Sequence, residues 1–200
     1  MINPTRLTRD QSRQQTRERL IASARRLVAA RGFAAASVRD IAEGAGYSQG
    51  AFYSNFESKE ALLLEVLRVF KTGEARQVAA TIDASGNDLG RALAGVEAWA
   101  EALSRNPEQA MLAAELQLQA LRDPSFGAAY ATVMAEQRGR YADLARQLFA
   151  LAGMAPPAHV EDIVSGLMSL ERGVALDRAA GFGTGFAAFS AFLRGLFSHP

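Results

Sequence analysis

Three serines punctuate residues 37–58, and their spacing constrains the fold more than any other feature. Ser37, Ser48 and Ser58 each precede a short run that carries apolar residues at helical intervals. A serine hydroxyl in that position accepts a hydrogen bond from a free N–H group in the first turn of a helix. Asp40 stands three residues after Ser37, which is the spacing of a capping box. The segment therefore predicts two short helices and the start of a third.

An amphipathic helix is predicted before this segment. One helical face is formed by the apolar residues Leu20, Ala24, Leu27 and Val28. Gly32 is suited to the end of that helix, because it adopts a positive φ without a Cβ clash. Gly46 is expected to end the helix that follows Ser37. Two helices joined by a short turn with glycine are typical of a helix-turn-helix, so residues 12–60 are predicted to hold one.

The remainder is predicted to form longer helices, because breakers such as Asn106-Pro107, Asp123-Pro124 and Pro156-Pro157 divide it. The expected ranges are 58–74, 88–105, 107–122, 125–153, 158–180 and 184–198. No segment has the sustained apolar and polar alternation of a half-buried strand. The sequence thus predicts an all-α protein with a three-helix N-terminal unit, residues 1–57, and a larger helical unit, residues 58–200.

Charge is distributed unevenly along the chain. The net charge is only +1, yet residues 1–60 hold ten basic and six acidic residues, which leaves −3 for the rest. A basic N-terminal unit favours a polyanion as its partner. The longest stretch without charge, residues 179–193, is shorter than the ~20 residues that cross a bilayer. We therefore expect a cytoplasmic protein with no membrane partner.

Composition argues against an enzyme. The sequence has no cysteine, which excludes disulfides, thiolate zinc sites and cysteine nucleophiles. Its two histidines form no His-x-x-x-His or Glu-x-x-His pair, and Gly-x-Ser-x-Gly is missing. We expect no catalytic residue, no bound metal and no cofactor.

The short helix after Ser48 carries residue types that read DNA. The Gln49 amide can pair with both N6 and N7 of adenine, and Ala51 can touch a thymine methyl group. Gly50 is a poor helix former and would let the backbone approach DNA closely. Neutral donors for phosphate are offered by Tyr53 and Asn55, and a positive charge at the next helix N-terminus by Lys59. Taken singly, each of these residues is also compatible with ordinary surface or core.

The same segment resembles the DNA-binding domain of the tetracycline-repressor (TetR) family over about residues 12–65. The matching residues, without a gap, are Ser37, Ile41-Ala42, Ala45-Gly46-Tyr47-Ser48, Gly50, Phe52-Tyr53, Asn55-Phe56 and Lys59-Glu60-Ala61-Leu62. The resemblance implies that Arg39, Gln49, Gly50 and Ala51 lie near base edges. It also implies that phosphates are held by Ser37, Ser48, Tyr53, Asn55 and Lys59. The N-terminal arm, residues 1–12, is followed by Arg13 and carries Arg6 and Arg9; with these arginines it either follows the DNA backbone, enters a minor groove or is a disordered tail.

The last two predicted helices are candidates for dimerisation, because a palindromic DNA site needs two recognition helices. They are rich in apolar residues, and the resemblance favours a two-fold interface of four helices. The candidate interface residues are Ile163, Leu167, Leu170, Val174, Phe186, Phe189, Leu193 and Phe197. Packing of the same residues within one chain is the alternative.

The middle helices are candidates for an effector pocket, since such pockets combine apolar walls with a few polar groups. The candidate lining residues are Trp99, Leu103, Met111, Glu115, Leu118, Phe126, Tyr130 and Met134. They favour a small hydrophobic or aromatic effector. We thus expect a ligand-responsive repressor that binds a palindromic operator in double-stranded DNA as a homodimer. A body with a purely structural or protein-binding role, and an activator in place of a repressor, are the alternatives.

Overall fold

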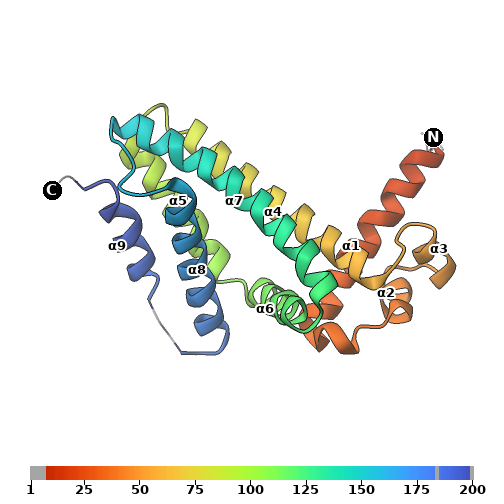
Figure 1. The fold of residues 1–200 in the computed structure, drawn as a ribbon. Helices are drawn as coiled ribbons and strands as arrows, with labels where there is room; N and C mark the ends of the chain where they lie inside the picture. The colour runs from red at the N-terminus through yellow and green to blue at the C-terminus, as the bar shows by residue number, and fades with distance from the viewer. Residues whose placement is uncertain (1–7, 183–184, 199–200) are drawn as a thin grey trace, which may run out of the picture.

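The computed structural model describes residues 8–182 and 185–198, and these residues form α-helices without any strand (Figure 1). Arg6, Gly183 and His199 lie outside the described residues. The helices are α1 (Arg9–Ala35), α2 (Val38–Gly44), α3 (Gln49–Tyr53), α4 (Lys59–Asp83), α5 (Leu89–Ser104), α6 (Pro107–Arg122), α7 (Pro124–Ala152), α8 (Val160–Ala179) and α9 (Ala187–Gly195). We call α1–α3 the head and α4–α9 the body. The predicted all-α class with an N-terminal helix-turn-helix is confirmed.

The predicted caps of the head are confirmed. The hydroxyls of Ser37, Ser48 and Ser58 accept hydrogen bonds from N–H groups three residues further on, at 3.1, 3.2 and 3.0 Å. Gly32 and Gly46 have φ of +81° and +80°, which a residue with a Cβ adopts only under strain. These short-range features fix where each helix of the head begins and ends.

Three helix bounds differ from the prediction. α4 continues through Gly73 to Asp83 instead of ending at residue 74, because Val78 and Ile82 prolong its buried stripe. α1 begins at Arg9, where Thr8 and Gln11 form a capping box that the sequence analysis overlooked. α9 covers only Ala187–Gly195 of the predicted 184–198.

The core of the head continues into the base of the body. Leu20, Ile41 and Phe52 have no exposed surface, and they belong to one apolar cluster with Leu62 of α4 and Phe126 of α7. In Figure 1, α4 and α7 run from the head to the far end of the molecule. The first turns of α4 therefore pack as part of the head, although the predicted boundary separates them at residue 57.

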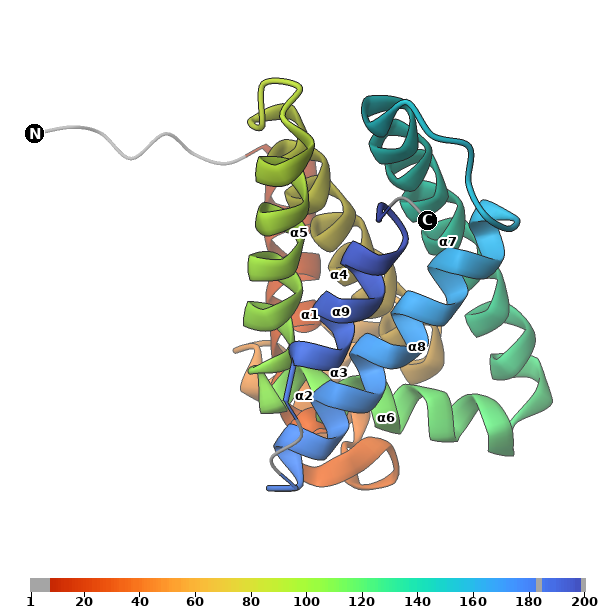
Figure 2. The ribbon, with the colours of Figure 1, turned by 90° about the vertical axis from the view of Figure 1, so that its left-hand side faces the viewer.

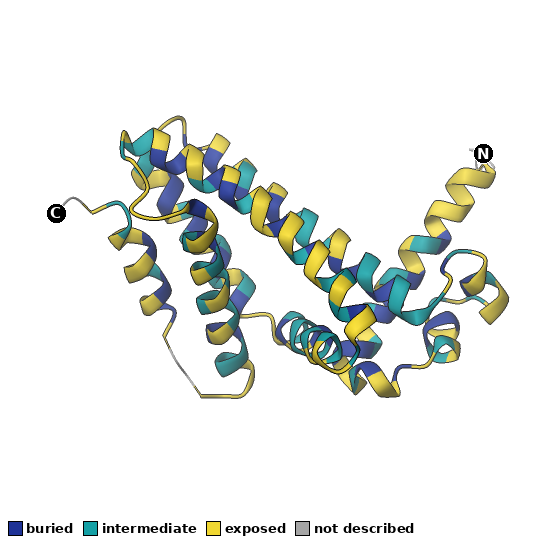
Figure 3. Cartoon of the chain, in the orientation of Figure 1, coloured by how far each residue is buried: buried dark blue, intermediate teal, exposed yellow. Residues whose placement is uncertain are grey.

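A second apolar cluster fills the far end of the body, where α4, α5, α7, α8 and α9 meet. Figure 2 shows α9 between α5 and α8, and both of these helices contact it. Figure 3 shows buried stripes along α4 and α7, whereas the beginning of α1 is exposed. None of the helices in 8–182 and 185–198 combines the length and apolar character needed to cross a membrane.

Candidate DNA-binding surface and interior cavity

α3 lies on the outside of the head with one face anchored in the core. Phe52 is fully buried and Phe56 is 5% exposed, whereas Gln49, Gly50 and Tyr53 lie at the surface. Tyr53 is 57% exposed. The buried phenylalanines hold this helix in place, so its polar face and its N-terminus are free to meet a partner.

Nothing inside the protein requires a glycine at position 50. A Cβ built there would meet only the Ser48 hydroxyl, at an ordinary distance of 3.7 Å, and the φ is not positive. Gly44 differs, because a Cβ there would approach the Ser23 hydroxyl to 2.7 Å, where α2 packs against α1. The helix penalty of Gly50 is therefore not offset by packing within the chain.

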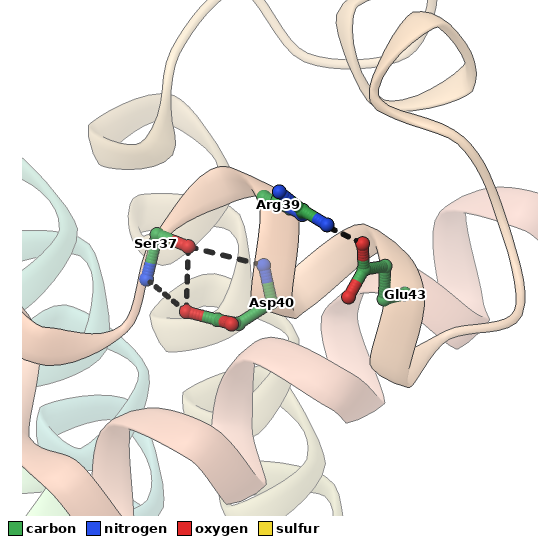
Figure 4. Close-up of polar contacts among 4 residues, drawn as sticks. All are labelled: Ser37, Arg39, Asp40 and Glu43. Atoms are coloured by element: carbon green, nitrogen blue, oxygen red, sulfur yellow. Dashed lines mark hydrogen bonds and ion pairs between the residues drawn. The ribbon is translucent and has the colours of Figure 1, made fainter.

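The start of α2 is fixed by a reciprocal capping box (Figure 4). The Ser37 hydroxyl donates to the Asp40 carboxylate at 2.5 Å and accepts from the Asp40 N–H, and the Ser37 N–H donates to the same carboxylate. The hydrogen bonds from Ser37 lower the pKa of the Asp40 carboxyl. Arg39 points away from this cap and pairs with Glu43 at 2.8 Å. Both side chains of this pair are exposed. Ser37 acts as a cap, and Arg39 is an accessible cation.

Two of the residues predicted to contact phosphate also bond within the chain. The Asn55 side-chain nitrogen donates to the Ala51 carbonyl at 2.8 Å, and its oxygen is buried without a partner among the described residues. The Arg17 guanidinium donates to the Asn55 carbonyl at 2.7 Å and lies 4.3 Å from the centre of the Phe56 ring. Asn55 thus closes the end of α3 with a partly exposed side chain, and its contact with a phosphate stays a prediction.

Lys59 also has a partner within the chain, and its contact with a phosphate stays a prediction. Its ammonium donates to the Phe33 carbonyl at 2.9 Å and lies 4.3 Å from the centre of the Phe33 ring. A cation at the C-terminus of a helix is favoured by the helix dipole, and the end of α1 provides that environment. The sequence located Lys59 at the N-terminus of α4, but it could not reveal that α1 ends beside it.

Glu115 of α6 holds the same end of α1 from the other side. Its carboxylate accepts a hydrogen bond from the Phe33 N–H at 2.8 Å, and a Cβ on Gly32 would approach it to 3.2 Å. A second link joins these helices, because Arg25 pairs with Glu108 at 3.1 Å. Glu115 also lines a cavity beside the end of α1, so its place at an effector pocket stays a prediction.

An interior cavity of about 110 Å³ lies among α4, α5, α7, α8 and α9, far from the head. The residues that line it are Lys71, Glu74, Val78, Ile82, Val96, Trp99, Leu103, Tyr141, Leu144, Ala145, Leu148, Phe149, Ile163, Val164, Leu167, Met168, Glu171, Arg172, Phe189, Leu193, Leu196 and Phe197. Most of them are apolar or aromatic, with a few charged groups among them. This composition is typical of a site for a small organic molecule.

Of the predicted pocket residues, Trp99 and Leu103 line this cavity, whereas Glu115 and Leu118 line a second cavity beside the end of α1. Phe126, Tyr130 and Met134 pack instead where the body meets the head, and the Phe126 ring lies 6.0 Å from that of Phe33. Met111 and Leu118 are surface residues, 46% and 38% exposed. Apolar spacing along a helix marks a buried face, but it does not say which of two cores that face enters.

The predicted dimer residues lie at or around the interior cavity. Ile163, Leu167, Phe189, Leu193 and Phe197 line the cavity. The remaining three, Leu170, Val174 and Phe186, belong to the core around it. These side chains therefore pack within one chain, and a contribution of the partly exposed ones to a dimer stays a prediction. The most apolar faces of α8 and α9 point towards α4, α5 and α7, and the cavity lies between these helices.

The outward faces of α8 and α9 carry small residues and one large aromatic residue. Gly166, Ser169 and Gly173 are exposed along α8, and Phe192 of α9 is 65% exposed beside the exposed Ala188. Small side chains permit close approach of a second helix. The sequence signal for this surface was present as Gly166 and Gly173, which recur at helical spacing.

Charged groups gather at one side of the cavity. The carboxylate of Glu74, only 4% exposed, pairs with Lys71 at 2.8 Å and also accepts from Gln109 of α6. Burial raises the pKa of the Tyr141 hydroxyl, and the nearby carboxylates of Glu74 and Glu171 add to the effect. Burial likewise raises the pKa of Glu171, to about 7.

α6 joins this charged side of the cavity to the head. Gln109 donates to Glu74, and the Arg172 guanidinium donates to Gln117 at 2.9 Å. The same helix carries Glu108 and Glu115, which bind α1. Groups that line the cavity and groups that hold the end of α1 are thus attached to one rigid element.

Sequence similarity to known proteins is concentrated in the head. Residues 20–66 match the family model described as bacterial regulatory proteins, tetR family. The chain is 46% identical over 56 residues to the uncharacterized HTH-type transcriptional regulator YerO of Bacillus subtilis, a match that covers 28% of this chain and 19% of that protein. It is 34% identical over 96 residues to the HTH-type transcriptional repressor KstR2 of Mycobacterium tuberculosis, 48% of each chain. The chain spans at most about half the length of these curated relatives.

Solved structures extend the likeness to the body. A TetR-family transcriptional regulator from Rhodococcus sp. has a TM-score of 0.77 over 92% of this chain and all of that chain, at 18% identity. At that identity the likeness concerns the fold. Residues 20–66 are thus similar in sequence to the tetR family of bacterial regulatory proteins, and the whole chain shares its fold with a TetR-family regulator.

Proposed function

We propose that this chain is a DNA-binding transcriptional regulator, a ligand-responsive repressor in which residues 1–57 bind DNA and residues 58–200 bind the effector and dimerise. The observation that carries the proposal is α3, with Gln49, Gly50 and Tyr53 at the surface above the buried Phe52. A short helix held in this way fits the major groove with its N-terminal residues at the base edges.

The residues of the head would have different roles in DNA binding. Gln49 would read a base edge, Gly50 and Ala51 would let the backbone of α3 come close, and Arg39 would reach a base from α2. Ser48 and Tyr53 would contact phosphates, which fix the position of the protein on the duplex. Ser37 would orient the first turn of α2 towards the backbone. Asn55 and Lys59 would combine structural roles with their predicted phosphate contacts.

A two-fold dimer would be formed by the outward faces of α8 and α9. Phe192 is exposed on α9 one turn after the exposed Ala188, and Gly173 is exposed on α8. An exposed aromatic side chain in a setting that permits close approach is suited to the centre of an interface. The two recognition helices would then meet half-sites about 34–36 Å apart, or a multiple of this distance, in a palindromic operator.

The effector would act through α4 and α6. α4 carries Lys71 and Glu74 at the cavity and Lys59 at the end of α1, and α6 binds both Glu74 and the Phe33 N–H. A ligand that displaces these helices at the cavity would shift the head and so change the spacing of the two α3 helices. A coupling of ~1–3 kcal/mol corresponds to a change of roughly 5- to 150-fold in operator affinity. A filled, rigid body without a cavity would have favoured a purely structural role.

The test is selection of bound duplexes from a random DNA library with the full chain. We expect a two-fold symmetric consensus whose half-sites are about one helical turn apart, or a multiple of it. Gln49→Ala should relax the preference at one position of each half-site. Enrichment of no sequence over the starting library would overturn the proposal.

A further inference from the structure

We propose that the cavity takes an organic cation, a molecule with an apolar or aromatic body and one positively charged nitrogen that pairs with Glu171. This inference names the ligand class for the effector site proposed above, and it rests on that site. It is based on the Glu171 carboxylate, which has no partner among the described residues, whereas the other charged side chains that line the cavity form hydrogen bonds or ion pairs.

Glu171 is the acidic group without a partner. Its side chain lines the cavity from α8, is partly buried, and forms no hydrogen bond or ion pair with any of the described residues, although the charges of Lys71 and Arg172 act to lower its pKa. A buried carboxylate without a partner carries a desolvation cost, which an incoming cation would offset. A ligand of the opposite charge is therefore the one that gains most here.

The two cationic side chains near Glu171 bond to other groups. Lys71 pairs with Glu74 at 2.8 Å, and Arg172 donates to Gln117 of α6 at 2.9 Å. The remaining titratable group that lines the cavity is Tyr141 of α7, whose hydroxyl lies 3.4 Å from the Glu74 carboxylate. The residues of α5 and α9 that line the cavity carry no charge. An anionic ligand would have to break one of these pairs and would lie beside two carboxylates.

The walls of the cavity also suit a cation. Aromatic rings line it from three helices, α5, α7 and α9, and from the turn after α9: Trp99, Tyr141, Phe149, Phe189 and Phe197. The faces of such rings attract organic cations, with tryptophan the strongest. The Trp99 and Tyr141 ring centres lie 6.0 Å apart, and those of Phe149 and Phe197 lie 4.7 Å apart. The site therefore combines π faces with a buried carboxylate.

The ionisation of Glu171 adds a pH signature. Because burial raises its pKa to about 7, the carboxyl is largely protonated at pH 5.5 and ionised at pH 8. A permanently charged cation binds the ionised form, so its affinity should rise with pH through this range and binding should release a proton. A neutral ligand of the same shape should show no such rise.

Three probes test the proposal: benzyltrimethylammonium, its uncharged isostere neopentylbenzene, and the anion phenylacetate. Trp99 is the only tryptophan in the sequence and lines the cavity, so its fluorescence reports binding in the full chain. At pH 8 we expect the cation to bind about tenfold more tightly than the isostere, and the anion more weakly than both. Glu171→Gln should remove the cation preference and its pH dependence. Glu136→Gln, a change at an exposed glutamate of α7, is the matched control and should retain both.

The outcomes separate this proposal from the proposed function. Equal or tighter binding of the isostere or the anion, or binding of none of the three probes, would overturn the cation proposal. An unchanged cation preference in Glu171→Gln would overturn it as well. If the cation binds as expected and leaves the affinity for the selected DNA unchanged, the cation site stands and ligand-responsive regulation fails.

Discussion

The head and the far end of the body satisfy their polar groups in different ways. In the head, α2 and α3 begin with a serine that caps them, and the apolar core residues Leu20, Ile41 and Phe52 are wholly buried. In the body, neither α8 nor α9 begins with a side-chain cap. There Glu171 has no partner among the described residues, and it lines a cavity. A closely packed unit keeps one shape, whereas a cavity beside an unpaired carboxylate leaves room for a ligand to stabilise another.

The largest effect is expected where the head is most tightly packed. Phe52→Ala should destabilise the protein by about 3–5 kcal/mol, because it removes a fully buried ring and leaves a void. Phe197→Ala, at the half-buried lining of the cavity, should cost less than half of that. Urea unfolding followed by circular dichroism measures both values. Equal costs would remove the contrast between a packed head and a hollow body.

Glu171 gives the next largest effect, with a definite sign in pH. Its folded-state pKa of about 7 lies above the usual carboxyl value of 4.5, so the folded protein holds this proton more strongly. Stability should therefore fall as pH rises from 4.5 to 7, by up to about 3 kcal/mol from this residue. Glu171→Gln should flatten that part of the profile. A parallel profile in the variant would show that burial does not penalise this carboxylate.

Gly50 separates folding from binding within the head. Gly50→Ala should leave the fold intact and stabilise it by up to about 1 kcal/mol, because the added Cβ finds free space in a helix. The same methyl group should weaken binding to selected DNA by roughly tenfold or more, since a close approach is lost. Gly139→Ala in α7, also in open space, is the control and should affect stability alone. Full DNA affinity in Gly50→Ala would place this residue outside the interface.

The smallest effect on stability is expected at the contact between the head and the body. Glu115→Gln weakens the charge-assisted hydrogen bond from the Phe33 N–H and should cost about 1 kcal/mol or less. Its larger consequence should be functional, because a cavity ligand would then change DNA affinity less than it does in the original protein. Gel-shift titrations with and without benzyltrimethylammonium measure this coupling. An undiminished ligand effect would assign the coupling to α4 alone.

The head could be predicted closely because its signals are local. Ser37 with Asp40, Ser48 and Ser58 lie within a few residues of the groups that they cap, so their spacing alone locates each helix start. The contacts in the head that the sequence did not reveal are long-range. Lys59 and Phe33 lie 26 residues apart, and no pattern along the chain indicates that they meet.

The body could be predicted only as a set of helices. Phe189 and Leu193 were recognised as buried, but whether their face met the cavity or a second chain depended on how α8 and α9 pack on α4 and α5. Phe126 and Trp99 looked alike as candidate pocket residues, yet they belong to different apolar clusters. Helical periodicity finds a buried face, whereas tertiary packing decides what that face meets.

The most direct test of the central claim is the specificity of DNA binding by the full chain. At one fixed salt concentration, the affinity for the selected duplex should exceed that for a scrambled duplex by at least about 10³-fold. Gln49→Ala should reduce this ratio while leaving the affinity for scrambled DNA nearly unchanged. Equal affinity for both duplexes, or an unchanged ratio in Gln49→Ala, would contradict the claim that α3 reads DNA sequence.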